Sequence, residues 1–251
     1  MEPTEEVKTR RNPLNIPFVV VLAFAVAMAA LSGALLLRRG TTEPARPPFT
    51  DTFNFEACTF NATGENPFFI LKPGYQLVFD GVEAGDNVHL EITVLGNTSV
   101  VDSVTTRVVQ ENHSVNDEIE EISYNYFAIC EETNSVVYFG ENVDIYLPNN
   151  VTVHTGSWLA GGNNRPGIMM PGTVLLGGRY YQEVAPGIAE DRAEIVDDNV
   201  TLATPAGTFT GCLKTEETTP IEPAFAGNKT YAPGIGLVQD DVLLLTSYGY
   251  I

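Results

Sequence analysis

The sequence predicts a mainly β protein, in which an N-terminal transmembrane helix is followed by one antiparallel β domain. Two observations support this class. An uncharged, apolar segment runs from Pro17 to Leu37. After residue 50, short segments rich in β-branched and aromatic residues alternate with turn residues, and no long stretch has a helical period. We expect the β domain to be a curved sheet, an incomplete barrel or a sandwich.

The apolar segment has the length and composition of a membrane-spanning helix. Residues 18–37 carry no charge, and Ser32 is their only polar side chain. About 20 helical residues, rising 1.5 Å each, cross the roughly 30 Å apolar core of a bilayer. A cleaved signal peptide is the main alternative, with Lys8, Arg10 and Arg11 as its charged start. Its apolar part would exceed the usual length of about 7–15 residues, so we expect an uncleaved anchor.

The anchor divides the chain into four parts. We expect a cytoplasmic tail (1–12), a transmembrane signal anchor (13–38), a Pro/Thr-rich tether (39–52) and an extracytoplasmic β domain (53–251). Three basic residues lie close to each end of the anchor, so the positive-inside rule does not orient it. Six Asn-x-Ser/Thr motifs favour an exported domain, since such Asn residues are glycosylated only after export. They begin at Asn61, Asn97, Asn112, Asn150, Asn199 and Asn228.

The chain is strongly acidic. Its formal net charge is −19, and only 3 of its 32 Asp/Glu residues precede residue 41, compared with 5 of its 13 Lys/Arg. A surface of this charge repels phosphate backbones, which excludes nucleic acid as a direct partner. The charge favours solubility, a salt-rich environment or the binding of divalent cations. We expect the membrane to be a partner through the anchor, with lipid or other cell-surface proteins as candidate partners of the domain.

Three cysteines, Cys58, Cys130 and Cys212, give an odd number. Export would permit one disulfide, and the third thiol would stay free or pair between chains. Their spacing does not select the pair. No Cys-x-x-Cys motif is present, so we expect structural roles.

The strands follow one another at short intervals after residue 70. Alternation is clearest where Val88, Leu90, Ile92 and Val94 are separated by polar residues. Turns are expected at Pro73-Gly74, Asp80-Gly81, Gly85-Asp86-Asn87, Gly96-Asn97 and Asn134-Ser135. The predicted strands are 75–79, 88–94, 103–109, 122–127, 136–139, 144–146, 151–153, 180–184, 193–196, 200–202, 208–209, 212–215, 229–231 and 235–238.

An ordered series of short motifs resembles a family of secreted or membrane-anchored prokaryotic β-rich domains. The motifs include Asn66-Pro-Phe-Phe69, Leu71-Lys-Pro-Gly74, Tyr138-Phe-Gly-Glu141, Gly156-Ser-Trp-Leu-Ala-Gly161, Arg165-Pro-Gly-Ile-Met-Met-Pro171, Tyr181-Gln-Glu183, Gly187-Ile-Ala-Glu-Asp191, Pro205-Ala-Gly-Thr-Phe209, Cys212-Leu-Lys-Thr215 and Tyr231-Ala-Pro-Gly-Ile-Gly-Leu-Val238. The chain departs from the family at Val137, where Trp is usual. The family has no assigned activity, so the resemblance implies architecture alone. A broader similarity to lipoprotein-carrier-like half barrels implies a concave face that holds lipid.

Two groups of residues are candidates for a site. The first is an apolar ligand face formed by Trp158, Arg165, Met169 and Met170, because Met side chains adapt to irregular ligands. Ordinary core packing is the favoured interpretation of the same residues. The second is a charged cluster, Glu183, Glu190, Asp191 and Glu194, which offers oxygen ligands for a cation or an acid–base pair. The favoured interpretation of this cluster is a solvated, charged turn between two strands.

The sequence predicts no metal centre, no cofactor and no catalytic residue. His89, His113 and His154 are far apart in the sequence and lack the spacing of zinc ligands. We therefore expect a membrane-anchored surface protein that is not an enzyme. It would bind a lipid or other apolar ligand on a sheet face, or act as a structural or interaction domain. A hydrolase that uses Glu183, Glu190 and Asp191 is the least supported hypothesis.

Overall fold

The computed structural model describes residues 46–251. The predicted tail and the anchor at Pro17–Leu37 lie outside this range. Among the described residues, no helix is long and apolar enough to cross a membrane. The described part instead contains eighteen β-strands and one short 3-10 turn, η1 (Phe55–Ala57).

Sixteen of the strands form one sheet, in which every pairing between strands is antiparallel. The sheet confirms the prediction of an antiparallel β domain. Its main path runs β12-β14-β15-β16-β17-β18-β4-β5-β6-β7-β8-β11-β13, with β1, β9 and β10 beside β7 or β8. The strands of the first half are β1 (Phe60–Asn61), β4 (Tyr75–Glu83), β5 (Asp86–Val101), β6 (Val104–Val115), β7 (Glu118–Cys130), β8 (Ser135–Leu147), β9 (Val151–Val153) and β10 (Trp158–Leu159). Those of the second half are β11 (Arg165–Met170), β12 (Arg179–Tyr181), β13 (Glu183–Val184), β14 (Arg192–Thr204), β15 (Gly207–Thr218), β16 (Gly227–Ala232), β17 (Gly236–Asp240) and β18 (Leu243–Tyr250). A separate two-stranded sheet consists of β2 (Gly64–Asn66) and β3 (Phe69–Leu71).

The two edge strands of the large sheet, β12 and β13, are neighbours in the sequence. β12 pairs with β14, and β13 pairs with β11, yet only Gln182 separates β12 from β13. The sheet therefore curls into a near-closed barrel. The two sides approach closely at this seam: a Cβ atom on Gly167 of β11 would lie 2.3 Å from the Gln182 carbonyl oxygen. Only glycine fits there.

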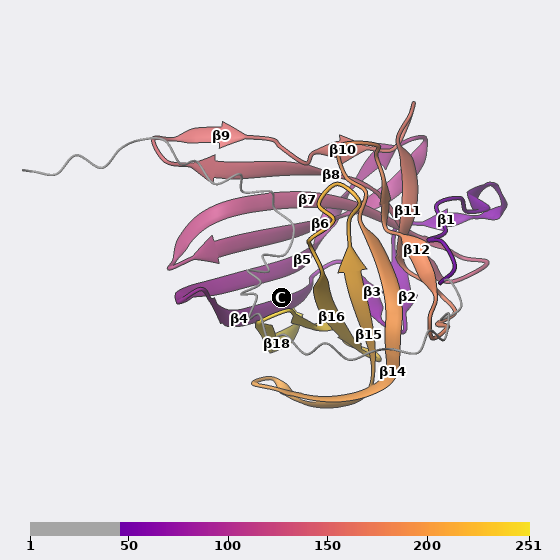
Figure 1. Ribbon diagram of the computed structural model, residues 1–251. Helices are drawn as coiled ribbons and strands as arrows, with labels where there is room; N and C mark the ends of the chain where they lie inside the picture. Colours follow the sequence, from indigo (N-terminus) through magenta and orange to yellow (C-terminus); the bar gives the residue numbers. More distant parts are fainter. Residues whose placement is uncertain (1–45) are drawn as a thin grey trace, which may run out of the picture.

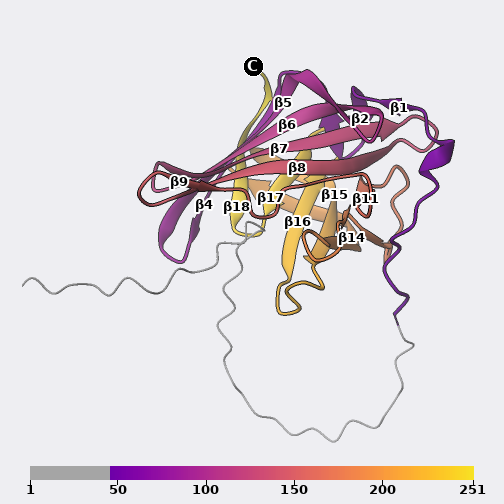
Figure 2. The ribbon, with the colours of Figure 1, turned by 90° about the horizontal axis from the view of Figure 1, so that it is seen from above.

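The long strands β5–β8 lie across β14–β16 in both views (Figures 1 and 2). Sheets that cross in this way turn their inner faces toward a common interior. At one end of that interior, large apolar side chains fill the space, among them Phe79, Val109, Leu213 and Leu245, each at most 1% exposed. The opposite end is different and contains a cavity.

Tight turns set the register of the long strands. The two residues at each of three turns have positive φ: Ala84-Gly85 between β4 and β5, Asp102-Ser103 between β5 and β6, and Asn116-Asp117 between β6 and β7. Two-residue hairpin turns of this kind match the twist of antiparallel strands.

The predictions of turns at Asp80-Gly81 and at Gly96-Asn97 are wrong, because β4 continues through the first pair and β5 through the second. The register of β5 with β6 shifts between Val94 and Thr98. Arg107 of β6 makes this irregular stretch possible, since its Nη1 donates to the carbonyl oxygens of Gly96 (2.8 Å) and Asn97 (3.2 Å). The guanidinium thus donates hydrogen bonds to carbonyl oxygens that are not used in the pairing of β5 with β6.

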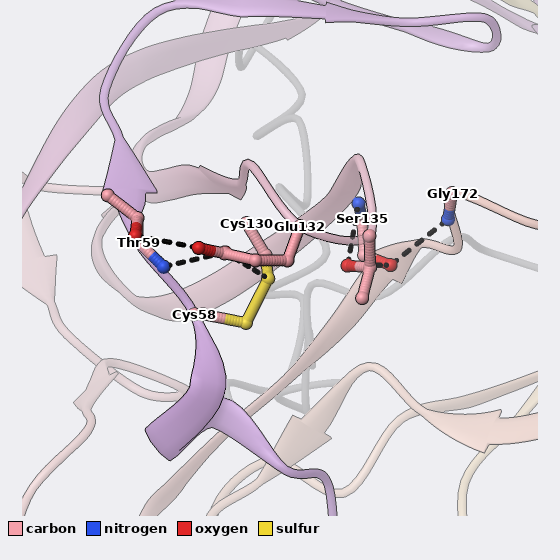
Figure 3. Close-up of a disulfide and its surroundings, with 7 residues drawn as sticks. Cys58, Thr59, Cys130, Glu132, Ser135 and Gly172 are labelled. Atoms are coloured by element: carbon pink, nitrogen blue, oxygen red, sulfur yellow. Dashed lines mark hydrogen bonds between the residues drawn. A yellow bond between two sulfur atoms is a disulfide. The ribbon is translucent and has the colours of Figure 1, made fainter.

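One disulfide joins Cys58 to Cys130, and Cys212 is a free thiol buried in the core. The sequence left this pairing open. The bond ties the segment around η1 to the end of β7, and Glu132 reinforces it (Figure 3). The backbone N–H and the hydroxyl of Thr59 each donate a 2.7 Å hydrogen bond to the Glu132 carboxylate.

The first described residues pack on the barrel. The N–H of Thr50 donates to the Arg179 carbonyl oxygen (3.0 Å), and the N–H of Tyr181 donates to the Thr50 carbonyl oxygen (2.8 Å). The guanidinium groups of Arg179 and Arg192 lie 4.0 and 4.4 Å from the centre of the Phe49 ring. Residues 46–52, the described part of the expected tether at 39–52, therefore contact the barrel, and we call them the seam strap.

Candidate functional site

A cavity of about 490 Å³ occupies one end of the barrel. It lies where β4 joins β5, β6 joins β7, β8 joins β9 and β17 joins β18, since residues from all these strand ends line it. Side chains on a strand alternate between the two faces of the sheet, so every second residue of these strands points inward. Ten of the 25 residues that line the cavity are acidic, and most of the others are apolar or aromatic.

Ten carboxyl groups line the cavity, and they come from all around the wall. They belong to Glu83, Glu111, Glu120, Glu121, Glu141, Glu183, Asp191, Glu217, Asp240 and Asp241. Among the described residues that line the cavity, the only basic side chains are Lys229 and His113. The wall therefore has a large excess of groups that become negative when they ionise.

Lys229 of β16 balances only part of this acidity. Its Nζ lies 3.2 Å from Glu217 Oε2 and 3.7 Å from Asp240 Oδ2. Burial alone would lower the pKa of Lys229, but the Asp240 and Glu217 carboxylates hold that pKa well above its usual value. Gln182 adds a 3.0 Å hydrogen bond from its Nε2 to Glu217 Oε1. This part of the wall is thus an ion-pair network, although Oδ1 of Asp240 has no hydrogen-bond partner among the described residues.

Three of the remaining carboxyl groups in the described chain are buried and leave one oxygen without a hydrogen-bond partner. Glu121, Glu183 and Asp191 are each no more than 7% exposed. One oxygen of each, namely Oε2 of Glu121, Oε2 of Glu183 and Oδ1 of Asp191, has no hydrogen-bond partner among the described residues. Buried acceptors without a donor cost free energy, so these atoms call for a donor inside the cavity.

The crowding of acids raises their pKa values. Burial, assisted by the neighbouring Glu111, raises the pKa of Glu121 to about 8. Burial also raises the pKa of Glu141 and of Glu183 to about 8, and nearby carboxyls add to both effects. The pKa of Asp191 lies well above its usual value for the same reasons. These carboxyl groups therefore hold protons at neutral pH when no other cation is present.

The structure brings together half of the predicted charged cluster. Glu183 and Asp191 line the cavity, whereas Glu194 pairs with Arg179 and Arg46 (3.2 Å each) and Glu190 accepts a 3.2 Å hydrogen bond from the N–H of Gly187. The expectation of a solvated turn is wrong for Glu183 and Asp191. Glu183 is buried because its strand closes the barrel, and the backbone carbonyl of Asp191 accepts from the N–H groups of Gln182 and Glu183.

The predicted apolar face separates into different environments. Met169 lines the cavity, and Met170 is fully buried in the core. Trp158 stands behind the wall, where its Nε1 donates a 3.2 Å hydrogen bond to Glu183 Oε1. Arg165 forms an ion pair with Asp51 of the seam strap at 3.1 Å. Only Met169 of the four therefore belongs to the cavity lining.

Most of the acidic wall was not identified from the sequence. Glu111, Glu121, Glu141, Glu217 and Asp240 are far apart along the chain. A signal exists in β7, where the polar Glu121, Ser123 and Asn125 are the buried residues that line the cavity. The pattern of apolar residues in this strand favours the opposite face, because a polar lumen inverts the usual alternation.

The carboxyl groups of the cavity do not converge as metal ligands would. Within residues 46–251, only Cys58, Cys130 and Glu132 form a group of three potential ligands with atoms within 4.8 Å of one another, and two of these are joined in the disulfide. Comparisons with protein-family models, with curated proteins and with solved structures found no match to this chain. The cavity is therefore the feature that points to a function, and the family resemblance of the motifs stays a prediction.

Proposed function

We propose that this protein is a binding protein that holds a small organic amine, as its ammonium cation, in the barrel cavity. One observation carries the proposal: ten carboxyl groups face a cavity of about 490 Å³ together with a single lysine. A cation would supply the charge that the wall lacks. Its N–H groups would also supply the donors that the unpartnered oxygens of Glu121, Glu183 and Asp191 require.

An organic cation suits the cavity better than a bare metal ion. Hard cations are held by several oxygens that converge on one point. The carboxyl groups of the cavity are instead distributed over β6, β7, β8, β13, β15 and β17. A ligand of several atoms can reach groups that are spread out in this way.

Apolar side chains in the outer part of the cavity, interspersed with acidic ones, can contact a hydrocarbon group. Leu147 and Pro148 lie at the end of β8, Val88 lies near the start of β5, and Val242 lies at the turn before β18. All four are at the end of the barrel where the turns are, whereas Glu141 is further from that end along β8. We therefore propose an amphipathic ligand, with its ammonium group inward and its apolar part toward the mouth. A wholly apolar lipid, as first expected, would leave the acidic groups without partners.

We further propose that this domain acts outside the cytoplasm, held by the predicted anchor at Pro17–Leu37. The Cys58–Cys130 disulfide supports this location, because disulfides persist in oxidising compartments. Asn61, Asn97, Asn150 and Asn199 are exposed and would be accessible to glycosylation, whereas Asn112 and Asn228 are partly buried.

Hydrolysis is a second candidate function, favoured by the raised pKa of Glu183 in a cavity, which is typical of a general acid. Acid–base catalysis also needs a second group whose pKa differs from that of the general acid. The pKa of Glu141, the carboxyl that raises the pKa of Glu183, is about 8 as well. Because the two pKa values are alike, Glu141 and Glu183 would not act as a separate acid and base. We therefore favour ligand binding over hydrolysis.

Calorimetry with matched ligands tests the proposal. The full-length protein in lipid nanodiscs would be titrated at pH 7.5 with n-hexylamine, n-hexyltrimethylammonium, n-hexanol and calcium chloride, with empty nanodiscs as the blank. We expect hexylamine to bind most tightly, because it alone combines charge, N–H donors and an apolar tail. Equal binding of hexanol would contradict the need for charge, and preferential binding of calcium would replace the amine with a metal ion.

A further inference from the structure

We infer that the cavity exchanges protons for its cationic ligand, so that amine binding expels protons from the wall and acidification releases the amine. This inference rests on the proposed function and adds to it a mechanism of release. It begins with the charge inside the barrel. At neutral pH the cavity wall does not ionise fully on its own, because its acidic groups greatly outnumber its one lysine.

The groups that face one another divide into two sets. Glu217 of β15 and Asp240 of β17 share Lys229 in an ion-pair network. Glu111 of β6, Glu121 of β7, Glu141 of β8, Glu183 of β13 and Asp191 face the cavity without a basic partner within salt-bridge distance among the described residues. His113 of β6 also faces the cavity, but burial lowers its pKa, so it does not supply a positive charge there at neutral pH.

The second set must therefore take up protons or a cation. Like charges close together in a buried site cannot all be present, because each unpaired charge loses its hydration. Without a bound cation, these carboxyl groups keep their protons. The raised pKa values of Glu121, Glu141 and Glu183 have the same cause. A bound ammonium group lowers these pKa values again, since an opposite charge favours the ionised form. Protons are then released into solution.

The rim of the cavity also carries acidic side chains. Glu83 of β4 and Glu120 of β7 line the mouth, with Asp241 at the turn between β17 and β18. Glu120 is exposed, and Glu83 and Asp241 are partly exposed, so these groups attract a cation from solution without the full cost of burial. The exchange itself takes place deeper, at the buried carboxyl groups.

The direction of the pH dependence follows from linkage. Protons and the amine compete for the same carboxylates, so affinity rises with pH until the empty cavity is itself ionised, near pH 8. Proton release per bound amine is therefore largest near pH 7 and small above about pH 9. The alkylammonium group itself, with a pKa of about 10.4, stays charged over this range.

Calorimetry in two buffers measures the exchange directly. The full-length protein in nanodiscs would be titrated with n-hexylamine at pH 7 in phosphate and in HEPES, whose protonation enthalpies differ, and the difference in heat gives the number of protons released. Because Tris is itself a small ammonium cation and would compete, HEPES replaces it at pH 7, and borate and CHES are the buffer pair at pH 9. We expect at least one proton per amine at pH 7 and a clear decrease at pH 9. Replacing Glu121 by Gln should lower the number at pH 7, whereas Glu190→Gln, outside the cavity lining, should leave it unchanged.

The outcomes separate the two proposals. Binding of hexylamine with no proton release at pH 7 would overturn the exchange and leave the binding function standing. Proton release that is equal at pH 7 and pH 9 would also overturn it, because the source could not be the buried carboxyl groups. Absence of any amine binding at either pH would overturn both.

Discussion

Trp158 holds Glu183 in place through one hydrogen bond, from indole Nε1 to Oε1 at 3.2 Å, and the second oxygen of Glu183 has no partner. The only tryptophan of the chain thus fixes the orientation of a buried acid in the wall of the cavity. The ring also packs edge-on against Tyr138, with ring centres 5.6 Å apart. Trp158 therefore both packs in the cavity wall and affects the ionisation of Glu183.

Replacing Trp158 by Phe tests this link. The hydrogen bond from Trp158 lowers the pKa of Glu183, in opposition to burial. Its loss should raise that pKa further and move the pH midpoint of amine binding to a more alkaline value. A pH series of hexylamine titrations measures the midpoint. An unchanged midpoint in a folded variant would show that Glu183 does not take part in the exchange.

The stability of the protein should decrease as the pH rises from about 5 to about 9. Glu121, Glu141 and Glu183 keep their protons to about pH 8 in the folded state, whereas an unfolded chain releases them near pH 4.3. The folded state therefore binds more protons throughout this range, and linkage makes the free energy of unfolding fall with pH. Urea unfolding at pH 5, 7 and 9, followed by Trp158 fluorescence, would measure the trend, and a stability maximum near pH 9 would contradict it.

The cysteine arrangement predicts a definite thiol count. Unfolded without reductant, the protein should react with a thiol reagent at Cys212 alone, and after reduction at all three cysteines. Replacing Cys58 and Cys130 by Ser should cost about 2–4 kcal/mol of folding free energy, because the bond closes a long loop. Three reactive thiols before reduction would show that the disulfide does not form.

The seam strap should contribute to the stability of the barrel. Replacing Phe49 by Ala removes the ring that contacts Arg179 and Arg192, and we expect a loss of about 1–2 kcal/mol in the free energy of unfolding. Leu175→Ala is a suitable control, since Leu175 is 66% exposed. Equal stability of the two variants would show that residues 46–52 do not belong to the folded unit.

The sequence was informative about strands and much less so about the interior. Alternation in Val88–Val94 and the dense β-branched segments identified the antiparallel sheet, because period two reflects the local geometry of a strand. Closure of the barrel was not foreseeable from local pattern, since it depends on β12 and β13 pairing with strands far apart in the chain. The acidic wall depends on the same closure. Glu183 and Asp191 were noticed as a local cluster, but Glu111 and Glu141 join them only in the folded barrel.

The most direct test of the proposed function compares amine binding in two variants of the wall. Glu141 and Glu183 would both be replaced by Gln in one protein, and Glu190, outside the cavity lining, would be replaced by Gln in the other. Charge-assisted hydrogen bonds contribute about 1.5–3 kcal/mol each, so loss of both carboxylates should weaken hexylamine binding at pH 8 by about 100-fold or more. The Glu190 variant should bind as the unmodified protein does, and urea unfolding would confirm that both variants are folded. Equal hexylamine affinity in the double variant and the unmodified protein would contradict the proposal that the acidic cavity binds the cation.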